Sequence, residues 1–293
     1  MTTVARTTRR LLTHERIARQ AGPVLRHAVL VLLSLAILLP LFWIAMSSLK
    51  PVAELYTVPT TLVPAHPTLR WYTFVLTKVP ALPLYYSNSI IVSAAATFGT
   101  VAIACLAGYA FARLDFPGRD LIFWLLIVSL FLPTSITSLF ALYELTDKLR
   151  LLDTQLGLIL PYINGGTIVG MFIMRSVFMS IPGELEDAAR IDGCGPLQIF
   201  LRIMLPLAAM GIVVVAILNF VGNWGEFLVA RTLTYEQART LPVAIATLQP
   251  QTGEWHFSTV TAAYMLMFGP AFLVMAILQR WFLKGLTEGG IKL

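Results

Sequence analysis

The stretch Ser176–Pro206 reads SVFMSIPGELEDAARIDGCGPLQIFLRIMLP and lies between two long apolar runs. Pro182 is typical of a helix start, and acidic residues follow it where a helix dipole favours negative charge. These acidic residues are Glu184, Glu186 and Asp187. Gly193 is typical of the residue after a helix, and Gly195-Pro196 permits a new start. The stretch therefore predicts a short helix, a sharp turn and a second helix.

The first of these helices is expected to present one small apolar face. Leu185, Ala188 and Ala189 are spaced i, i+3 and i+4, which places them together on a helix. Because alanine side chains are small, another surface could approach this face closely.

The chain around this stretch is too apolar for a water-soluble protein. Of the 293 residues, 57% are hydrophobic and only 12% are charged, about half the charged share of a typical soluble domain. The mean hydropathy is +0.78. This composition excludes a soluble globular domain, a disordered chain and a disulfide scaffold, and it favours a bundle of helices in a membrane.

Six long stretches of the chain are apolar enough to cross a bilayer as helices. They cover approximately residues 28–49, 86–111, 121–143, 154–175, 203–226 and 257–280. None of them alternates between polar and apolar residues, which argues against an outer-membrane barrel. The sequence thus predicts an all-α membrane protein with a membrane domain over residues 28–283. The arm 1–27, the loop 176–202 and the tail 284–293 would lie outside the bilayer.

The distribution of charge predicts which side each loop occupies. With six spans the two termini share a side, and that side would carry 14 basic and 8 acidic residues. The other side would carry seven of each, so the net charge of +6 falls entirely on the side of the termini. By the positive-inside rule the termini and the loop 176–202 are expected in the cytoplasm. We read the first span as a retained helix and the basic segment before it as a cytoplasmic arm, not as a signal or transit peptide.

The sequence lacks several motifs for enzyme chemistry. It contains no G-x4-G-K-[ST] phosphate loop, H-E-x-x-H zinc motif or G-x-S-x-G nucleophile turn. Cys105 and Cys194 fall in different predicted environments, so neither a disulfide nor a metal site is expected. We therefore expect a chain that is not an enzyme and does not hydrolyse ATP. Because the basic excess follows the predicted topology, we expect no binding of nucleic acid.

The spacing within the loop resembles a known family. Asp187-Ala188-Ala189, then three residues, Gly193, then nine residues and Ile203-Met204-Leu205-Pro206 is similar to E-A-A-x3-G-x9-I-x-L-P. That pattern is the EAA loop of ABC importer permeases. The departure is Asp187 in place of Glu, which keeps the carboxylate and shortens it by one methylene.

Other segments resemble the carbohydrate-importer branch, and in particular the maltose permease G subunit type. Gly108–Arg119 looks like its turn between the second and third spans, and Leu156–Tyr162 looks like its fourth-span opening. Asn223–Phe227 is similar to its W-N-E/D-F segment, with Gly225 at the usual Asn, and Gln279–Gly285 closes the chain in the same way. The first 20 or so residues fall outside the resemblance.

The resemblance implies a type I ABC importer permease fold in the plasma (inner) membrane of a bacterium or archaeon. It implies a heterodimer with a second permease, two ATPase subunits that hold ATP and Mg, and an external solute-binding protein. No cofactor would be bound by this chain. The residues expected to couple the permease to the ATPases are Glu186, Asp187, Ala188, Ala189, Gly193, Ile203, Leu205 and Pro206.

Polar residues in the fifth span are the candidates for a solute path, because buried polar groups in membranes are often functional. Asn219, Asn223 and Glu226 are spaced i, i+4 and i+7, with Trp224 beside them. Alternatively, these groups bond neighbouring helices or mark the membrane interface. For Asn88 and Asn164 we favour a structural role, and for Gly165, Gly166 and Gly170 close helix packing.

The main hypothesis is a permease subunit of an ATP-driven sugar importer for a mono- or oligosaccharide. The solute could instead be glycerol 3-phosphate or a polyol, although the fifth span offers no Arg or Lys for a phosphate. A secondary transporter or a membrane scaffold would be a different class. The first often shows repeated halves and midplane charges, and the coupling loop argues against the second.

Overall fold

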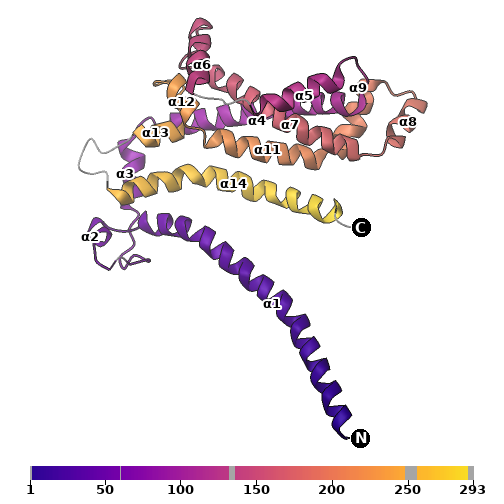
Figure 1. Cartoon of the computed structure of the whole chain (residues 1–293). Helices are drawn as coiled ribbons and strands as arrows, with labels where there is room; N and C mark the ends of the chain where they lie inside the picture. The colour runs from indigo at the N-terminus through magenta and orange to yellow at the C-terminus, as the bar shows by residue number, and fades with distance from the viewer. Residues whose placement is uncertain (1, 60, 132–135, 248–255, 290–293) are drawn as a thin grey trace. The chain divides into compact units, whose positions relative to one another are not determined.

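The computed structural model of the chain describes residues 2–59, 61–131, 136–247 and 256–289. Every regular element within these ranges is a helix, so the prediction of an all-α fold is confirmed (Figure 1). The helices are α1 Thr2–Ser47, α2 Val52–Leu55, α3 Arg70–Lys78, α4 Leu82–Arg113, α5 Arg119–Ser129, α6 Ile136–Lys148, α7 Gln155–Ser180, α8 Glu184–Ile191, α9 Pro196–Ile199, the π-helix η1 Phe200–Met204, α10 Leu205–Leu207, α11 Ala209–Trp224, α12 Leu228–Leu233, α13 Leu241–Thr247 and α14 Phe257–Gly289.

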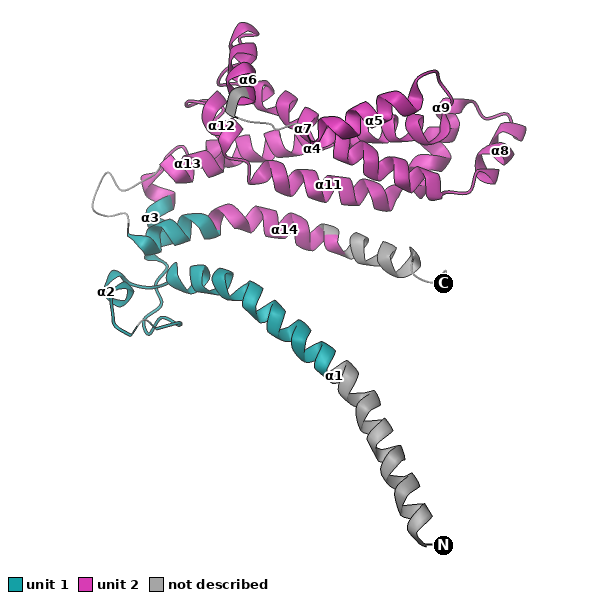
Figure 2. Cartoon of the chain, viewed as in Figure 1, with its two compact units in different colours: residues 1–75, 252–265 teal, residues 76–251, 266–293 magenta. Residues whose placement is uncertain are grey.

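The chain divides into two units, which Figure 2 colours separately. The first contains residues 1–75 and 252–265, and the second contains residues 76–251 and 266–293. In the first unit the carbonyl of Lys50 accepts hydrogen bonds from the indole of Trp71 and the hydroxyl of Ser258. The ammonium of Lys50 lies 4.8 Å from the ring centre of Trp43. These contacts join the segment just after the C-terminal end of α1 to α3 and the start of α14.

In the second unit α4, α7 and α11 pack against one another. Small residues permit this close approach: a Cβ added at Gly108 of α4 would lie 2.7 Å from the Cβ of Met174 in α7. Buried aromatic and sulfur-containing side chains, including Tyr109, Phe178 and Phe200, fill the end of this bundle nearest α8. The bundle therefore provides a packed frame on which the loop 176–202 is mounted.

Among the described residues, four helical segments are long and apolar enough to cross a membrane, namely Leu25–Ser47, Leu82–Arg113, Gln155–Ser180 and Phe257–Ile277. A fifth crossing results if the pair Pro196–Leu207 and Ala209–Trp224, bent by 73°, is one span. The predicted third span, 121–143, is divided between α5 and α6, and residues 132–135 between them lie outside the described residues. The count of six spans and the cytoplasmic position of the termini stay predictions.

The predicted fifth span, 203–226, differs from a single straight helix. It begins in the π-helix η1, bends at Ala208 and ends as a helix at Trp224. Pro206 has no amide hydrogen to donate, which weakens the helix just before the bend. The bend separates the loop-proximal part of the span from α11.

Candidate functional site

The helix α8 stands at one end of the second unit and carries four of the eight predicted coupling residues. As predicted, glycine ends it: Gly193 has φ +83, a left-handed conformation that suits glycine. The amide of Gly193 donates to the carbonyl of Arg190 and that of Cys194 to the carbonyl of Ala189. The next helix starts at Pro196, where the amide of Gly195 donates to the side chain of Gln198. The predicted sequence of helix, turn and helix is confirmed.

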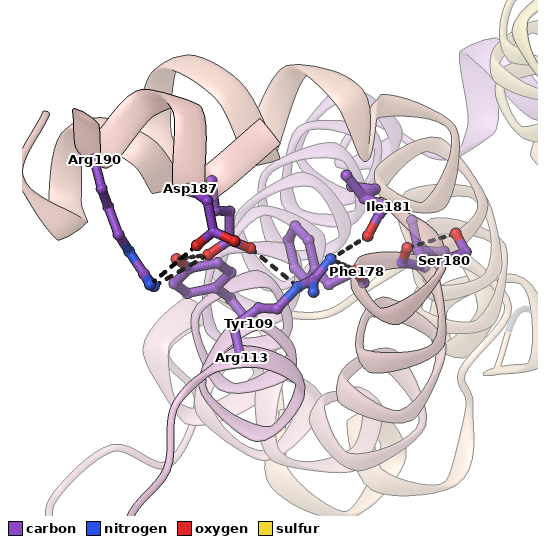
Figure 3. A network of polar contacts seen from close by, with 9 residues as sticks. Tyr109, Arg113, Phe178, Ser180, Ile181, Asp187 and Arg190 are labelled. Carbon is purple, nitrogen blue, oxygen red and sulfur yellow. Dashed lines mark hydrogen bonds and ion pairs between the residues drawn. The ribbon is translucent and has the colours of Figure 1, made fainter. Parts of the chain in front are cut away.

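Glu186 is the buried anchor of α8, and Figure 3 shows the network of polar contacts at this place, with Tyr109, Arg113 and Arg190 labelled. Its residue is only 4% exposed, and its Oε1 lies 3.0 Å from Nε of Arg113 at the end of α4. Neither atom makes a hydrogen bond of standard geometry, so charge holds this contact. The hydroxyl of Tyr109 donates to Oε2 at 3.3 Å, and Arg190 lies 3.8 Å from the same oxygen.

Arg113 also closes the end of α7. Its guanidinium donates to the carbonyl of Phe178 at 2.8 Å and to the carbonyl of Ile181. Both carbonyls lie at the C-terminus of α7, where helices leave unpaired acceptors and favour positive charge. Arg113 thus links α4, the end of α7 and α8.

The other face of α8 is open to solvent in the chain alone. Asp187 has a side chain that is 70% exposed and lies 3.5 Å from Arg190. Leu185 is 43% exposed and Ile191 is 87% exposed, and Ala188 between them is exposed as well.

Leu185, Ala188 and Ala189 lie on one side of α8 by their spacing, but they do not share one environment. Ala189 is 5% exposed and packs into the core cluster, whereas Leu185 and Ala188 point outward. The reason is that the ion pair of Glu186 with Arg113 fixes the rotation of α8. This contact turns Glu186 and Ala189, spaced i and i+3, toward the bundle.

The second part of the motif joins the loop to the same core. Ile203 and Leu205 pack against the buried cluster that contains Phe178 and Ala189. Pro206 is exposed and lies two residues before the bend at Ala208. The motif residues thus occupy both ends of one packed region, from α8 to the start of the bent span.

A pocket of about 510 Å³ lies between α6, α7 and the end of α11. Asn219, Asn223 and Glu226 all line it, as a common path would require. Asn164 and Gly165 of α7, for which we favoured structural roles, line it as well. A Cβ added at Gly165 would meet no atom within 4 Å, so this glycine faces open space.

Glu226 reaches this pocket from a position that differs from the predicted one. The helix α11 ends at Trp224 with Gly225 as its cap, so Glu226 is not on the same helix face as Asn219 and Asn223. Its carboxylate accepts hydrogen bonds from the amides of Val229 and Ala230, at 2.8 and 3.0 Å. The hydroxyl of Tyr162 in α7 donates to it at 2.6 Å. These three donors hold the carboxylate in place.

Trp224 lies elsewhere. Its residue is 3% exposed, its indole donates to the carbonyl of Met267 at 3.1 Å, and its ring stacks on Phe220. It is not among the residues that line the pocket. Its contacts hold α11 to the part of α14 that belongs to the second unit.

Asn88 and two of the glycines have the structural surroundings that we favoured. The amide of Asn88 donates to the carbonyls of Gln237 and Arg239 and accepts from Gln155. A Cβ added at Gly166 would lie 1.8 Å from Oδ1 of Asn219, and one at Gly170 would lie 3.0 Å from the Cβ of Ala104. The two glycines serve contacts between helices, whereas Asn88 joins α4 to α7 and to the loop before α13.

No sequence pattern pointed to Asp153, whose carboxylate organises the loop after α12. Its carboxylate accepts hydrogen bonds from the amides of four successive residues, Tyr235, Glu236, Gln237 and Ala238. Burial raises the pKa of this carboxyl, and the four backbone hydrogen bonds lower it. The hydrogen bonds together outweigh burial, so the pKa lies below its ordinary value. Among the described residues no group of three His, Cys, Asp or Glu side chains could hold a metal ion.

Arg113, Tyr109 and Tyr162 were also missed as site residues. Arg113 and Tyr109 lie in the segment Gly108–Arg119, whose resemblance to the family marks it without assigning roles. Both residues contact Glu186, and Tyr109 lies 77 positions before it in the chain. No local sequence pattern pairs residues so far apart.

Comparison with known proteins places this geometry in a family. The family described as "Binding-protein-dependent transport system inner membrane component" matches residues 100–288. The sulfoquinovosyl glycerol transport system permease protein SmoH of Agrobacterium fabrum is 38% identical over 93% of this chain and 95% of its own length. The diacetylchitobiose uptake system permease protein NgcG of Streptomyces coelicolor is 31% identical over 90% and 87%. The sn-glycerol-3-phosphate transport system permease protein UgpE of Yersinia pestis is 31% identical over 89% and 95%.

Solved structures share the fold. A chain of a bacterial ABC transporter involved in the import of the acidic polysaccharide alginate matches with a TM-score of 0.78 and 20% identity, over 90% of this chain and 98% of that one. A chain of a bacterial alginate ABC transporter in complex with its alginate pentasaccharide-bound periplasmic protein matches with a TM-score of 0.61 and 16% identity. The latter match covers 90% of this chain and 93% of that one.

Proposed function

Because the chain belongs to the family of binding-protein-dependent transport system inner membrane components, the permeases of carbohydrate ABC importers, we propose that it conducts a sugar into the cytoplasm. It translocates its solute and catalyses no reaction. The energy comes from ATP bound by two separate ATPase subunits, together with Mg. A second permease completes the pathway, and an external binding protein delivers the sugar.

The observation that carries this proposal is the anchored helix α8. One face, with Glu186 and Ala189, is held against the bundle, and the other, with Leu185 and Ile191, is free. Exposed large apolar side chains beside charged ones are typical of a docking surface. The free face fits contact with an ATPase subunit. When ATP binding closes the pair of ATPase subunits, this subunit would push on α8.

The pocket between α6, α7 and α11 is the proposed solute path on this chain. Its size falls in the range of small-molecule sites, from about 300 to 1,000 Å³, and its amide and carboxylate groups suit sugar hydroxyls. Within the described lining there is no Arg, Lys or His, which favours a neutral sugar over a phosphate ester. Glycerol 3-phosphate or a polyol is the alternative solute, since one relative is named for glycerol 3-phosphate.

The energy source separates this proposal from a secondary transporter. A secondary transporter would carry its own coupling charges at the midplane. The pocket of this chain holds one carboxylate, that of Glu226, which already accepts hydrogen bonds from three donors.

The inner membrane is the expected location. The relatives named above come from bacteria, and nothing favours the archaeal option.

A solute panel tests the proposal. The chain is co-expressed with its partner permease, ATPase subunits and binding protein, and the complex is placed in liposomes with ATP inside. We expect accumulation of at least one labelled neutral mono- or oligosaccharide, and less of glycerol 3-phosphate and of a sulfonated sugar. Accumulation of glycerol 3-phosphate alone would move the assignment to the alternative, and accumulation of no sugar would refute it.

A further inference from the structure

Three segments that are far apart in the sequence meet at the side chain of Arg113 (Figure 3). Arg113 is the last residue of α4, its guanidinium binds the carbonyls of Phe178 and Ile181 at the end of α7, and its Nε faces Glu186 of α8. A cation at a helix C-terminus is favourable because the last carbonyls are unpaired. The same cation is thus shared between a helix end and a carboxylate.

The burial of this pair makes the two side chains depend on each other. The side chain of Glu186 is 5% exposed and that of Arg113 is 18% exposed. Removing one member of a buried ion pair leaves the other charge without a partner in a poorly hydrated place, which is unfavourable. The surrounding groups are the hydroxyl of Tyr109, at 3.3 Å from Oε2 of Glu186, and Arg190, which is 62% exposed and 3.8 Å away.

The rest of α8 is attached to the bundle mainly by small groups. Ala189 is its other buried residue, and its connection to α7 is the short segment between Ser180 and Glu184. The helices α4 and α7 pack along each other. A force applied to the exposed face of α8 therefore reaches α4 most directly through the contact of Glu186 with Arg113.

We propose that Arg113 is a positioning residue for transport, which makes α8 and the ends of α4 and α7 move as one body through its ion pair with Glu186. This inference rests on the proposed function, in which α8 receives the motion of an ATPase. The inference assigns different roles to the two neighbouring carboxylates of α8. Glu186 faces inward and transmits motion, whereas Asp187 faces outward and is available to the partner.

A double-mutant cycle in the complete complex tests whether the two residues act as a unit. The variants are Arg113→Ala, Glu186→Ala and the double substitution, with Glu186→Asp as the conservative variant. The measured quantity is labelled sugar taken up per ATP hydrolysed in liposomes, with the sugar that the wild type accumulates from the panel above. A purely structural role would lower the amount of complex without changing this ratio.

We expect each alanine variant to lower the ratio about fivefold or more, the size of a typical coupling between sites. The double variant should be no worse than the poorer single variant, and Glu186→Asp should restore part of the ratio. Arg119→Ala is the matched control, since it breaks the pair with Asp115, whose side chain is 96% exposed, at the same end of the bundle. Unchanged ratios in the single variants, or effects that multiply in the double variant, would overturn the proposal.

A distance measurement tests the same inference without any sugar. Spin labels are placed at Asp192→Cys, the exposed C-cap of α8, and at Asp115→Cys just beyond α4, with Cys105 and Cys194 replaced by alanine. With Arg113 present, the distance between the two labels should stay the same when ATP and vanadate are added. In the Arg113→Ala variant the distribution of distances should become broader. A distance that changes on ATP binding in the wild type would overturn the inference. This distance measurement needs ATP and vanadate but no sugar. It therefore tests the role of Arg113 even if the panel of sugars shows no uptake.

Discussion

Two adjacent carboxylates of α8 have opposite surroundings. Glu186 is buried against Arg113 and Tyr109, whereas the side chain of Asp187 is 70% exposed and faces only Arg190. The helical rotation of about 100° per residue separates them, but it does not say which of the two turns inward. The partner 73 positions earlier in the chain decides that, and no local pattern identifies it. Sequence reasoning could therefore predict that the motif carries acidic residues, but not their roles.

At the residue scale, Gly193 is required by its backbone. A left-handed φ costs a β-branched residue more than the 1–2 kcal/mol typical of side-chain-bearing residues, and Gly193 has φ +83. We expect Gly193→Val to destabilise the turn after α8 and to lower uptake per ATP, while Gly193→Asn keeps most of it.

The matched control for this prediction is Gly195→Ala. Gly195 has φ −74, and a Cβ there meets no atom within 4 Å, so the substitution should be silent. Equal activity of Gly193→Val and Gly195→Ala would show that the left-handed turn is not needed.

Asp153 gives a prediction that depends on pH. Its folded-state pKa is lowered, so its stabilising contribution is complete above the ordinary carboxyl pKa of about 3.9 and is lost as the pH falls below that value. Asp153→Asn should therefore lower the thermal unfolding midpoint at neutral pH and speed hydrogen exchange at residues 235–238. The difference from the wild type should close in acid. A difference that is the same at all pH values would mean that the ionised carboxylate is not what holds this loop.

At the element scale, the exposed side of α8 should be the contact for an ATPase subunit. Ile191 is 87% exposed, and a glutamate there would put a charge into an apolar contact without touching the bundle. We expect Ile191→Glu to reduce the ATPase subunit that co-purifies with the permease while leaving permease expression unchanged. Leu114→Glu, at an exposed loop position of the same unit, is the control. Full co-purification with Ile191→Glu would exclude this face as the contact.

The two glycines of α7 beside the pocket offer a second test at this scale. Because a side chain at Gly165 would enter open space, Gly165→Leu should leave stability unchanged and lower the rate of sugar uptake by filling the pocket. Gly166→Ala should instead reduce stability, since its Cβ would collide with Asn219. Thermal unfolding and uptake rates separate the two effects. Normal uptake by a stable Gly165→Leu variant would show that the solute takes another route.

The elements were predictable to different degrees. Long apolar runs are enough to predict α4 and α7, because burial in a bilayer demands them. The course of the fifth span was predictable only in part, since Pro206 favours a bend but no local pattern places the bend at Ala208 or the end at Trp224. The prediction assumed one continuous helix and therefore placed Glu226 on the same face as Asn219 and Asn223. In the structure Glu226 lies beyond the end of α11, and its carboxylate accepts hydrogen bonds from the first turn of α12.

At the scale of the whole molecule, the family assignment and the packing of the second unit support one account. A bundle of α4, α7 and α11 holds a polar pocket at one place and an anchored helix, α8, at another. The charge distribution of the sequence predicts that α8 faces the cytoplasm. The composition indicated a membrane protein, and the motif and the family support the proposal that a different chain binds the ATP.

The most direct test of this account is the energy requirement of uptake. Liposomes that contain the complete complex and the binding protein receive a labelled sugar with ATP inside, with ATP and vanadate inside, or with only a proton or sodium gradient. We predict accumulation with ATP, none with vanadate and none with a gradient alone, and loss of ATP-driven uptake when residues 184–192 are deleted. Uptake driven by a gradient without ATP, or ATP-driven uptake that survives the deletion of α8, would contradict the central claim.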